Sequence, residues 1–213
     1  TGDILVDAST NDNDVLNVAL AGNPGAATIQ NIETINFTAT AAANNVSLAN
    51  VSGLKTITVT GAPAGAIAFT NIGTGTGVTT IDASTVSTNA GGVTASFAAS
   101  TSTAALTLKG GAGADVFISG LGNDTVSGGA GADRLITGAG DDTVSGDGGA
   151  DIIDAGSGND VITGGAGADV VSGGTGANTF VFAAGANGAA PSATVFDTIT
   201  DFRTGTNNVI DFA

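Results

Sequence analysis

A nine-residue pattern repeats eight times without interruption between residues 110 and 181. The repeats begin GGAGADVFI, SGLGNDTVS, GGAGADRLI and TGAGDDTVS, and they continue GDGGADIID, AGSGNDVIT, GGAGADVVS and GGTGANTFV. A period this short and this regular predicts a stacked repeat architecture, because one unit cannot bury its apolar side without its neighbours. We number the positions of each repeat from one to nine.

Three of the nine positions keep one chemical character throughout. Position four is always glycine, and position six is aspartate in seven repeats and asparagine in the eighth. Position eight is always a bulky apolar residue: Phe117, Val126, Leu135, Val144, Ile153, Ile162, Val171 and Phe180. A flexible glycine-rich linker has no reason to keep these residue types in phase, so we expect an ordered structure.

The composition excludes several classes of function. The 213-residue chain has a formal net charge of −15 with only 4 basic residues, which argues against binding to nucleic acid or to an anionic membrane. It contains no cysteine and no histidine, so disulfides, thiolate metal sites and histidine chemistry are absent. No stretch approaches the ~20 apolar residues that span a bilayer, so no membrane insertion is expected. The start TGDILVDAST has neither a methionine nor a signal-peptide pattern, and we expect a piece of a larger protein.

Three regions differ in composition: 1–109, 110–181 and 182–213. The first is rich in Thr, Val, Ile, Ala and Asn, and it contains alternating segments such as TINFT, TITVT and TASFA that predict short β-strands with one buried face. Aligned Thr-Ile pairs place Ile35, Ile57 and Ile81 in equivalent positions, 22 and 24 residues apart. This spacing favours solenoid turns; an ordinary β-sandwich is the alternative. No segment has a capped helical pattern, so the chain is expected to be all-β.

The repeat suits calcium because that ion takes about 6–8 oxygen ligands from carboxylates and backbone carbonyls. Glycine lets positions one to six form a tight loop that exposes its carbonyls. Positions seven to nine form a short strand whose position eight points inward. The candidate ligands are Asp115, Asp124, Asp133, Asp142, Asp151, Asp160, Asp169 and Asn178 at position six, and, through their carbonyl oxygens, Gly111, Gly113, Gly120, Gly122, Gly129, Gly131, Gly138, Gly140, Gly149, Gly158 and Gly167.

Two repeats are expected to make one turn of 18 residues, with odd repeats stacked on odd and even on even. Position five supports this pairing, since it is alanine in the odd repeats and Asn123, Asp141 and Asn159 in the first three even repeats. Position one is glycine in the odd repeats and Ser119, Thr137 and Ala155 in those even repeats. Eight loops then allow six sandwiched ions, whose +12 charge offsets most of the −15.

The predicted coil has a thin core, because only one residue in nine points inward. At ~25 cal/mol per Å² this burial cannot outweigh the ordering entropy of so many glycines. Without metal, aspartates about 4.8 Å apart also repel one another. We therefore expect residues 110–181 to be disordered in chelator and β-structured in millimolar calcium.

These residues resemble the RTX proteins, which carry repeats-in-toxin, or hemolysin-type, calcium-binding repeats. The resemblance implies a right-handed parallel β-solenoid, the calcium β-roll, with the position-six aspartates and loop carbonyls as ligands. It also implies secretion from a Gram-negative bacterium, through type I export, with folding outside the cell. The segments FVFAAG at 180–185 and DTITDFRTGTNNVIDFA at 197–213 are similar to the β cap that follows such rolls. Region 1–109 is similar to the solenoid of RTX-type surface-layer proteins.

Several residues have two interpretations or depart from the repeat. Asp147 replaces the glycine of position two, where aspartate tolerates a left-handed backbone better than most residues. Asn178 lacks charge, so its site should be the weakest. The segment STNDNDVLN at 9–17 is similar to a decayed repeat, in which Asp12 and Asp14 either hold an ion or form a solvated turn. The tail acids Asp197, Asp201 and Asp211 either solvate the surface or form an extra ion site.

The favoured hypothesis is a calcium-dependent structural segment of a secreted, self-assembling surface-layer or matrix protein. Its partners would be calcium and neighbouring surface molecules, bridged through outward acids such as Asp141, Asp147 and Asp154. The alternative is the roll of a type I-secreted hydrolase or adhesin, acting as a calcium-triggered folding and export module. Catalysis within this chain is not expected, because acids outside the roll such as Glu33 and Asp82 are isolated.

Overall fold

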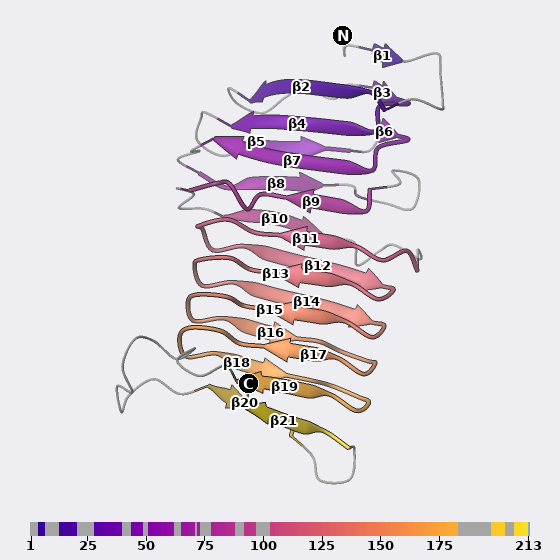
Figure 1. The fold of residues 1–213 in the computed structure, drawn as a ribbon. Helices are drawn as coiled ribbons and strands as arrows, with labels where there is room; N and C mark the ends of the chain where they lie inside the picture. Colours follow the sequence, from indigo (N-terminus) through magenta and orange to yellow (C-terminus); the bar gives the residue numbers. More distant parts are fainter. Residues whose placement is uncertain are drawn as a thin grey trace.

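The computed structural model describes residues 4–6, 13–20, 28–39, 44–48, 51–61, 65–70, 72, 78–87, 92–96, 103–182, 197–202 and 207–212. These residues form β-strands joined by turns and contain no helix, so none of them belongs to a helix that could cross a membrane. Every pairing between strands is parallel, and the successive coils stack into an elongated solenoid (Figure 1). The expected all-β solenoid is confirmed, and the β-sandwich alternative is wrong.

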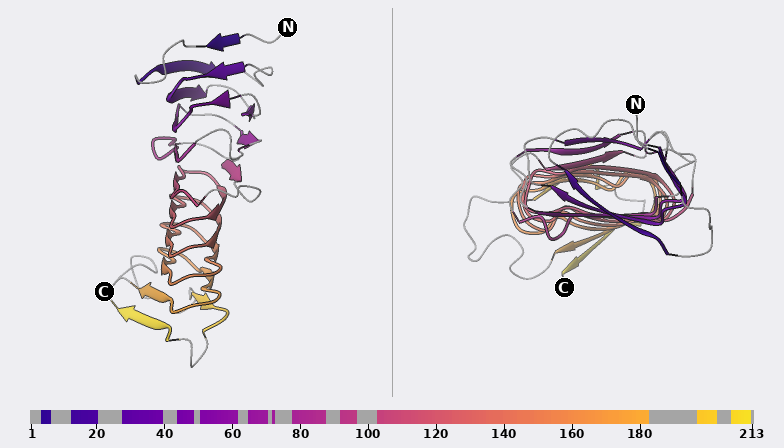
Figure 2. Two further views of the ribbon diagram at one scale, coloured as in Figure 1. Left: turned by 90° about the vertical axis from the view of Figure 1, so that its right-hand side faces the viewer. Right: turned by 90° about the horizontal axis from the view of Figure 1, so that it is seen from above.

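Two long sheets run along the solenoid and face each other. The ten-stranded sheet contains, in order, β2 (Val15–Leu20), β4 (Thr34–Ala39), β7 (Thr56–Gly61), β9 (Thr80–Asp82), β11 (Thr107–Lys109), β13 (Thr125–Ser127), β15 (Thr143–Ser145), β17 (Val161–Thr163), β19 (Thr179–Phe182) and β21 (Val209–Phe212). The eight-stranded sheet contains β5 (Asn44–Ser47), β8 (Ile67–Thr70), β10 (Val93–Ser96), β12 (Val116–Leu121), β14 (Arg134–Ala139), β16 (Ile152–Asp154), β18 (Val170–Ser172) and β20 (Thr198–Ile199). Seen from above, the coils superpose as a flattened ring (Figure 2).

A third, three-stranded sheet lies near the N-terminal end. It consists of β1 (Ile4–Val6), β3 (Thr28–Gln30) and β6 (Val51–Ser52). The early coils therefore have three sides, whereas the coils of the repeat region have two. Both long sheets continue without a break from the first region into the repeats, since β11 pairs with β9 and β13 in one sheet and β10 pairs with β8 and β12 in the other.

The repeat region has the register that its sequence predicts. Thr125 pairs with Thr143, and Val116 pairs with Arg134, so residues 18 apart lie side by side. The odd repeats form strands of the eight-stranded sheet, and the even repeats form strands of the ten-stranded sheet. Two repeats thus make one turn, as expected.

Apolar residues form continuous columns between the two sheets. The position-eight residues of all eight repeats are at most 4% exposed, and their neighbours at positions seven and nine point outward or are half-buried. In the ten-stranded sheet, Ile35 pairs with Ile57 and Ile57 with Ile81, which confirms the alignment of the looser repeat. The column then continues through Leu108 into Val126, so one core serves both regions.

Left-handed backbone at positions two and four turns the chain within the loops of repeats two to eight. Gly149 at position four has φ 142°, and a Cβ atom there would lie 1.5 Å from the carbonyl oxygen of Gly131 in the preceding turn. Only glycine fits such a site. At position two, Asp147 has φ 67°, which confirms that this aspartate adopts the left-handed conformation of the glycine it replaces.

The tail continues both sheets beyond the last repeat. Thr198 pairs with Val170, and Ile210 pairs with Phe180. The Phe202 ring lies 6.0 Å from the Phe180 ring, centroid to centroid, and so covers the last turn of the repeats. The outer side of the tail stays open, since Phe212 is 80% exposed.

Candidate metal-binding loops

The eight side chains at position six all lie inside the coil, at the start of a strand. Each is at most 2% exposed: Asp115, Asp124, Asp133, Asp142, Asp151, Asp160, Asp169 and Asn178. The odd repeats place theirs along one edge of the flattened coil, which we call the odd edge, and the even repeats place theirs along the opposite even edge. A row of buried carboxylates is costly unless each is paired or bound to a cation.

One oxygen of each carboxylate is held by the preceding turn. The backbone N–H of Asp124 donates to Oδ1 of Asp142 at 2.8 Å, and on the odd edge the N–H of Asp133 donates to Oδ1 of Asp151 at 2.8 Å. The same contact recurs along both edges, at 2.9 Å between Asp151 N–H and Asp169. These hydrogen bonds fix the direction of every carboxylate, so the side chains form two ladders along the coil.

The second oxygen of most of these carboxylates has no partner among the described residues. Buried Oδ2 atoms without a hydrogen bond belong to Asp124, Asp133, Asp142, Asp151, Asp160 and Asp169, and the buried amide nitrogen of Asn178 is likewise unpaired. Asp115 differs, because its Oδ2 accepts the N–H of Gly111 at 2.9 Å. Leaving a buried acceptor unsatisfied costs about 1–3 kcal/mol, and more when it is charged.

On the odd edge, two oxygen atoms pack against the glycine at position one, where a side chain would clash with them. A Cβ atom on Gly146 would lie 2.4 Å from Oδ2 of Asp151 and 2.3 Å from the carbonyl oxygen of Gly164 in the next turn. Gly128 has the same surroundings, with Oδ2 of Asp133 at 2.3 Å. A carboxylate oxygen and a backbone carbonyl thus converge where a side chain is absent. Hard oxygen donors of this kind fit a calcium ion.

On the even edge, the first two repeats have a hydroxyl side chain at position one. Ser119 Oγ donates to the carbonyl of Thr137 at 2.9 Å, and Thr137 Oγ1 donates to the carbonyl of Ala155 at 2.9 Å. The alternation of residue types at position one is visible in the sequence. It distinguishes the odd edge, where position one is glycine, from the even edge, where most repeats have a side chain there. The carbonyl oxygens of position one were not among the predicted ligands. Whether these carbonyl oxygens can share an ion with an aspartate depends on the direction in which the carboxylates point.

The predicted glycine carbonyls fall into two groups. At position two, the carbonyl of Gly129 accepts the N–H of Gly148 at 2.8 Å, and that of Gly138 accepts the N–H of Ser157 at 2.8 Å. At position four, the carbonyls of glycines such as Gly131 accept no backbone N–H within the described residues. A carbonyl oxygen has two lone pairs, so either group can still donate one to a metal. Ligation by these carbonyls stays a prediction.

Burial makes the carboxylates of the ladders reluctant to ionise. Burial, with a smaller contribution from the neighbouring carboxylates Asp133 and Asp169, raises the pKa of Asp151 to about 7. Burial likewise raises the pKa of Asp115 and of Asp160 to about 6 each, against the hydrogen bonds from backbone N–H groups that lower it. A divalent cation beside these oxygens would reverse the effect, because it stabilises the ionised form.

No group of three or more acidic side chains gathers around one point in the described part of the chain. Acids of one edge instead follow each other at one per turn. Since calcium needs about 6–8 oxygens, backbone carbonyls and water must supply most of the ligands at each site. The position-six residues can hold the ion, and the glycine loops can complete its shell.

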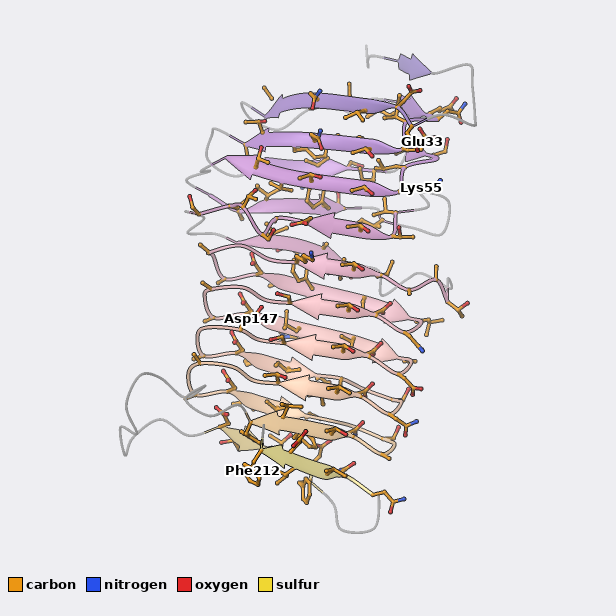
Figure 3. The ribbon with its side chains drawn as sticks, in the orientation of Figure 1. Glu33, Lys55, Asp147 and Phe212 are labelled. Atoms are coloured by element: carbon orange, nitrogen blue, oxygen red, sulfur yellow. The ribbon has the colours of Figure 1, made fainter. Side chains whose placement is uncertain are left out.

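The position-six column of the even edge continues into the first region with different chemistry. Glu33 takes this position one turn before Lys55, whose N–H donates to the Glu33 carbonyl at 2.9 Å, and both lie at one edge of the coil (Figure 3). Oε2 of Glu33 accepts the N–H of Asp14 at 3.0 Å. Further along, Leu106 occupies the column and donates its N–H to Oδ1 of Asp124 at 2.8 Å. The repeat region thus starts directly on a part of the coil whose described residues include no row of buried acids.

The decayed repeat expected at 9–17 is described in part. Leu16 pairs with Ile35, so Leu16 occupies the inward column and Asp14 precedes it as position six would. Asp12 lies outside the described residues. Neither the ion site nor the solvated turn is decided by these contacts.

An exposed polar ladder accompanies the even edge at position five. Oδ1 of Asp141 accepts the N–H of Asn159 at 2.7 Å, and the N–H of Asp141 donates to Oδ1 of Asn123 at 3.0 Å. This ladder runs in the opposite direction to the buried one, since each side chain here accepts from the following turn. The alternation of residue types at position five predicted two different edges. It did not predict the hydrogen bonds between position-five residues of successive turns.

Comparison with known proteins agrees with the repeats. The family model of the RTX calcium-binding nonapeptide repeat matches the chain in four copies, at residues 107–126, 127–162, 145–180 and 154–188. The searches of curated proteins and of solved structures found no match. Parallel coils with position-six carboxylates facing the loops define a calcium-binding β-roll. Residues 107–188 are therefore RTX-type calcium-binding repeats, and proteins with such repeats are typically secreted.

Proposed function

We propose that this chain is the calcium-dependent structural part of a secreted protein that assembles at a bacterial cell surface, as a surface layer or matrix. The observation that carries the proposal is the pair of buried aspartate ladders, in which six of the seven aspartates have a second oxygen without a protein partner among the described residues. The residues of the roll would hold calcium, which supplies the positive charge that these ladders lack. We propose no catalytic activity for the chain.

About six ions, one between each pair of stacked loops, are proposed to fill the roll. Six aspartates keep an unpaired buried oxygen, which supports this number. The position-six carboxylate and the carbonyls of the adjacent loops would be the ligands on both edges. Asn178 ends the even edge without a charge, so the site next to it is proposed to be the weakest.

Calcium is proposed to control folding of the roll but not of the first region. Roll strands such as β13 bury one side chain each, whereas β4 buries Ile35, Phe37 and Ala39. The first region, 1–109, can therefore stay folded without metal and offer its last strands as a template. The roll, 110–181, would fold onto this template outside the cell, where calcium is available, and the tail, 182–213, would cover its end. This order suits type I export, in which the chain leaves the cell unfolded.

Self-association is proposed to use the acids on the outside of the coil. Asp141, Asp147 and Asp154 are exposed, and calcium can bridge such carboxylates between neighbouring molecules. Asp147 lies on the odd edge (Figure 3), where the hydroxyl of Ser145 donates to its Oδ1 at 2.6 Å. A rigid rod with acids along its sides would then pack into an ordered array only when calcium is present.

Electron microscopy of the purified chain across a calcium titration tests the proposal. We expect ordered sheets or filaments above a threshold of calcium, and dispersed particles in chelator. Calcium-induced folding without any assembly would favour the alternative role, the roll of a secreted hydrolase or adhesin. Assembly that is the same in chelator and in calcium would overturn the proposed dependence on the ion.

A further inference from the structure

Asp197, in the tail, occupies the position-six column of the odd edge one turn beyond the last odd repeat. β20 continues β18, with Thr198 beside Val170, so Asp197 precedes its strand as Asp169 precedes β18. The N–H of Asp169 donates to Oδ1 of Asp197 at 3.1 Å, the contact that links successive aspartates in the roll. The spacing here is 28 residues rather than 18, and Asp197 lies outside the matched repeats.

The space between these two carboxylates has the character of a cation site. Asp169 is 1% exposed, and its Oδ2 is buried without a hydrogen-bond partner among the described residues. A Cβ atom on Gly164 would lie 2.6 Å from this oxygen, so the oxygen packs directly against a glycine where a side chain would clash with it. The Asp197 carboxylate is half-buried and is the next acid along the ladder. Two carboxylates that face each other in this way repel unless a proton or a cation lies between them.

The other polar groups of the tail are engaged differently. Both oxygens of Asp201 accept hydrogen bonds: Oδ1 from the N–H of Gly173 at 2.9 Å, and Oδ2 from the hydroxyl of Ser172 at 3.0 Å. Asp211 is exposed on β21. On the even edge, the N–H of Asn178 donates to Oδ1 of Asn208 at 2.9 Å, but neither amide carries charge. Among these groups, only Asp197 adds a charged ligand to a ladder.

We propose that Asp169 and Asp197 hold a further calcium ion beyond the last nonapeptide and thereby tie the tail to the roll. The inference rests on calcium binding by the roll. The additional site lies at the C-terminal end of the odd edge, and one of its ligands comes from outside the repeats. Backbone carbonyls and water would complete the shell. Calcium would then order the tail as well as the roll, because one ligand comes from each.

The test compares Asp197→Asn with the matched control Asp211→Asn in the full chain. Asparagine keeps the acceptor for the Asp169 N–H and removes the charge, so the tail strand can still form. After dialysis against calcium, elemental analysis should find one ion fewer per chain in Asp197→Asn than in wild type, and no change in Asp211→Asn. Circular dichroism checks that both variants remain folded.

Hydrogen exchange at residues 197–202 of the wild type gives a second readout that needs no variant. Calcium should slow exchange there, and Asp197→Asn should remove this protection while leaving that of the roll. Wild-type stoichiometry and tail protection in Asp197→Asn would overturn the site while leaving the roll's calcium binding intact. Failure of the wild type to bind any calcium would instead overturn the proposed function itself.

Discussion

Replacing Asp142 by alanine tests the buried ladder in the middle of the even edge. Asp142 is 1% exposed, its Oδ1 accepts the N–H of Asp124 at 2.8 Å, and its Oδ2 is unpaired. The substitution leaves the buried N–H without a partner, which costs about 1–3 kcal/mol. Losing one ion from a site filled at about one hundred times its dissociation constant removes about 2.7 kcal/mol more. We therefore expect about 4–6 kcal/mol less stability in calcium.

Asp141→Ala is the matched control, because the neighbouring residue loses the same charge at the surface. Its Oδ1 accepts the N–H of Asn159 at 2.7 Å, but this contact is exposed and water can replace the lost acceptor. We expect a loss below about 1 kcal/mol. Urea unfolding in calcium, followed by circular dichroism, measures both variants, and isothermal titration gives their calcium affinities. Equal losses, or an unchanged affinity in Asp142→Ala, would refute the assignment of the buried ladder as the ligand row.

Three further perturbations follow from the same structure. Gly149→Ala should lower the urea midpoint sharply, because Gly149 has φ 142° and a Cβ there would lie 1.5 Å from a carbonyl oxygen of the preceding turn. Gly148→Ala should leave the midpoint nearly unchanged, because the nearest contact of a Cβ at Gly148 is 3.7 Å. Because the pKa of Asp151 rises from 3.8 to about 7, the folded metal-free roll binds more protons than the unfolded chain. The stability of the metal-free roll is then greatest below about pH 4 and falls as the pH rises toward 7. Circular dichroism of dialysed metal-free protein should therefore show a loss of β-structure over that range. The opposite trend would contradict the burial of these acids. In chelator at neutral pH, hydrogen exchange should be fast at residues 110–182 and slow at 28–39, and uniform protection would exclude folding by calcium.

Much of the coil could be predicted because its period is short. Position eight is a bulky apolar residue every nine residues, so Phe117 and Val126 had to face the same core from opposite sheets. The match of Ile35 with Ile57 was visible because Thr-Ile pairs mark it. Asp147 could be placed in a left-handed turn because glycine occupies that position in the other repeats.

The parts that escaped prediction depend on direction and distance rather than on residue type. Sequence indicates that Asp151 lies in a loop, but not that its Oδ1 turns back to the Asp133 N–H while its Oδ2 faces the position-one carbonyl of Gly164. Asp197 was one of three tail acids with equal claims, because 28 residues separate it from Asp169 and the period is lost. Only the pairing of β20 with β18 distinguishes it from Asp201.

The most direct measurement is a crystal structure of the chain grown in calcium, with anomalous scattering used to locate the ions. We expect peaks along both edges of the roll, each beside an Oδ2 atom such as that of Asp151 and within coordination distance of backbone oxygens from the next turn. An intact coil whose loops show no anomalous peaks would contradict the claim that calcium joins its turns.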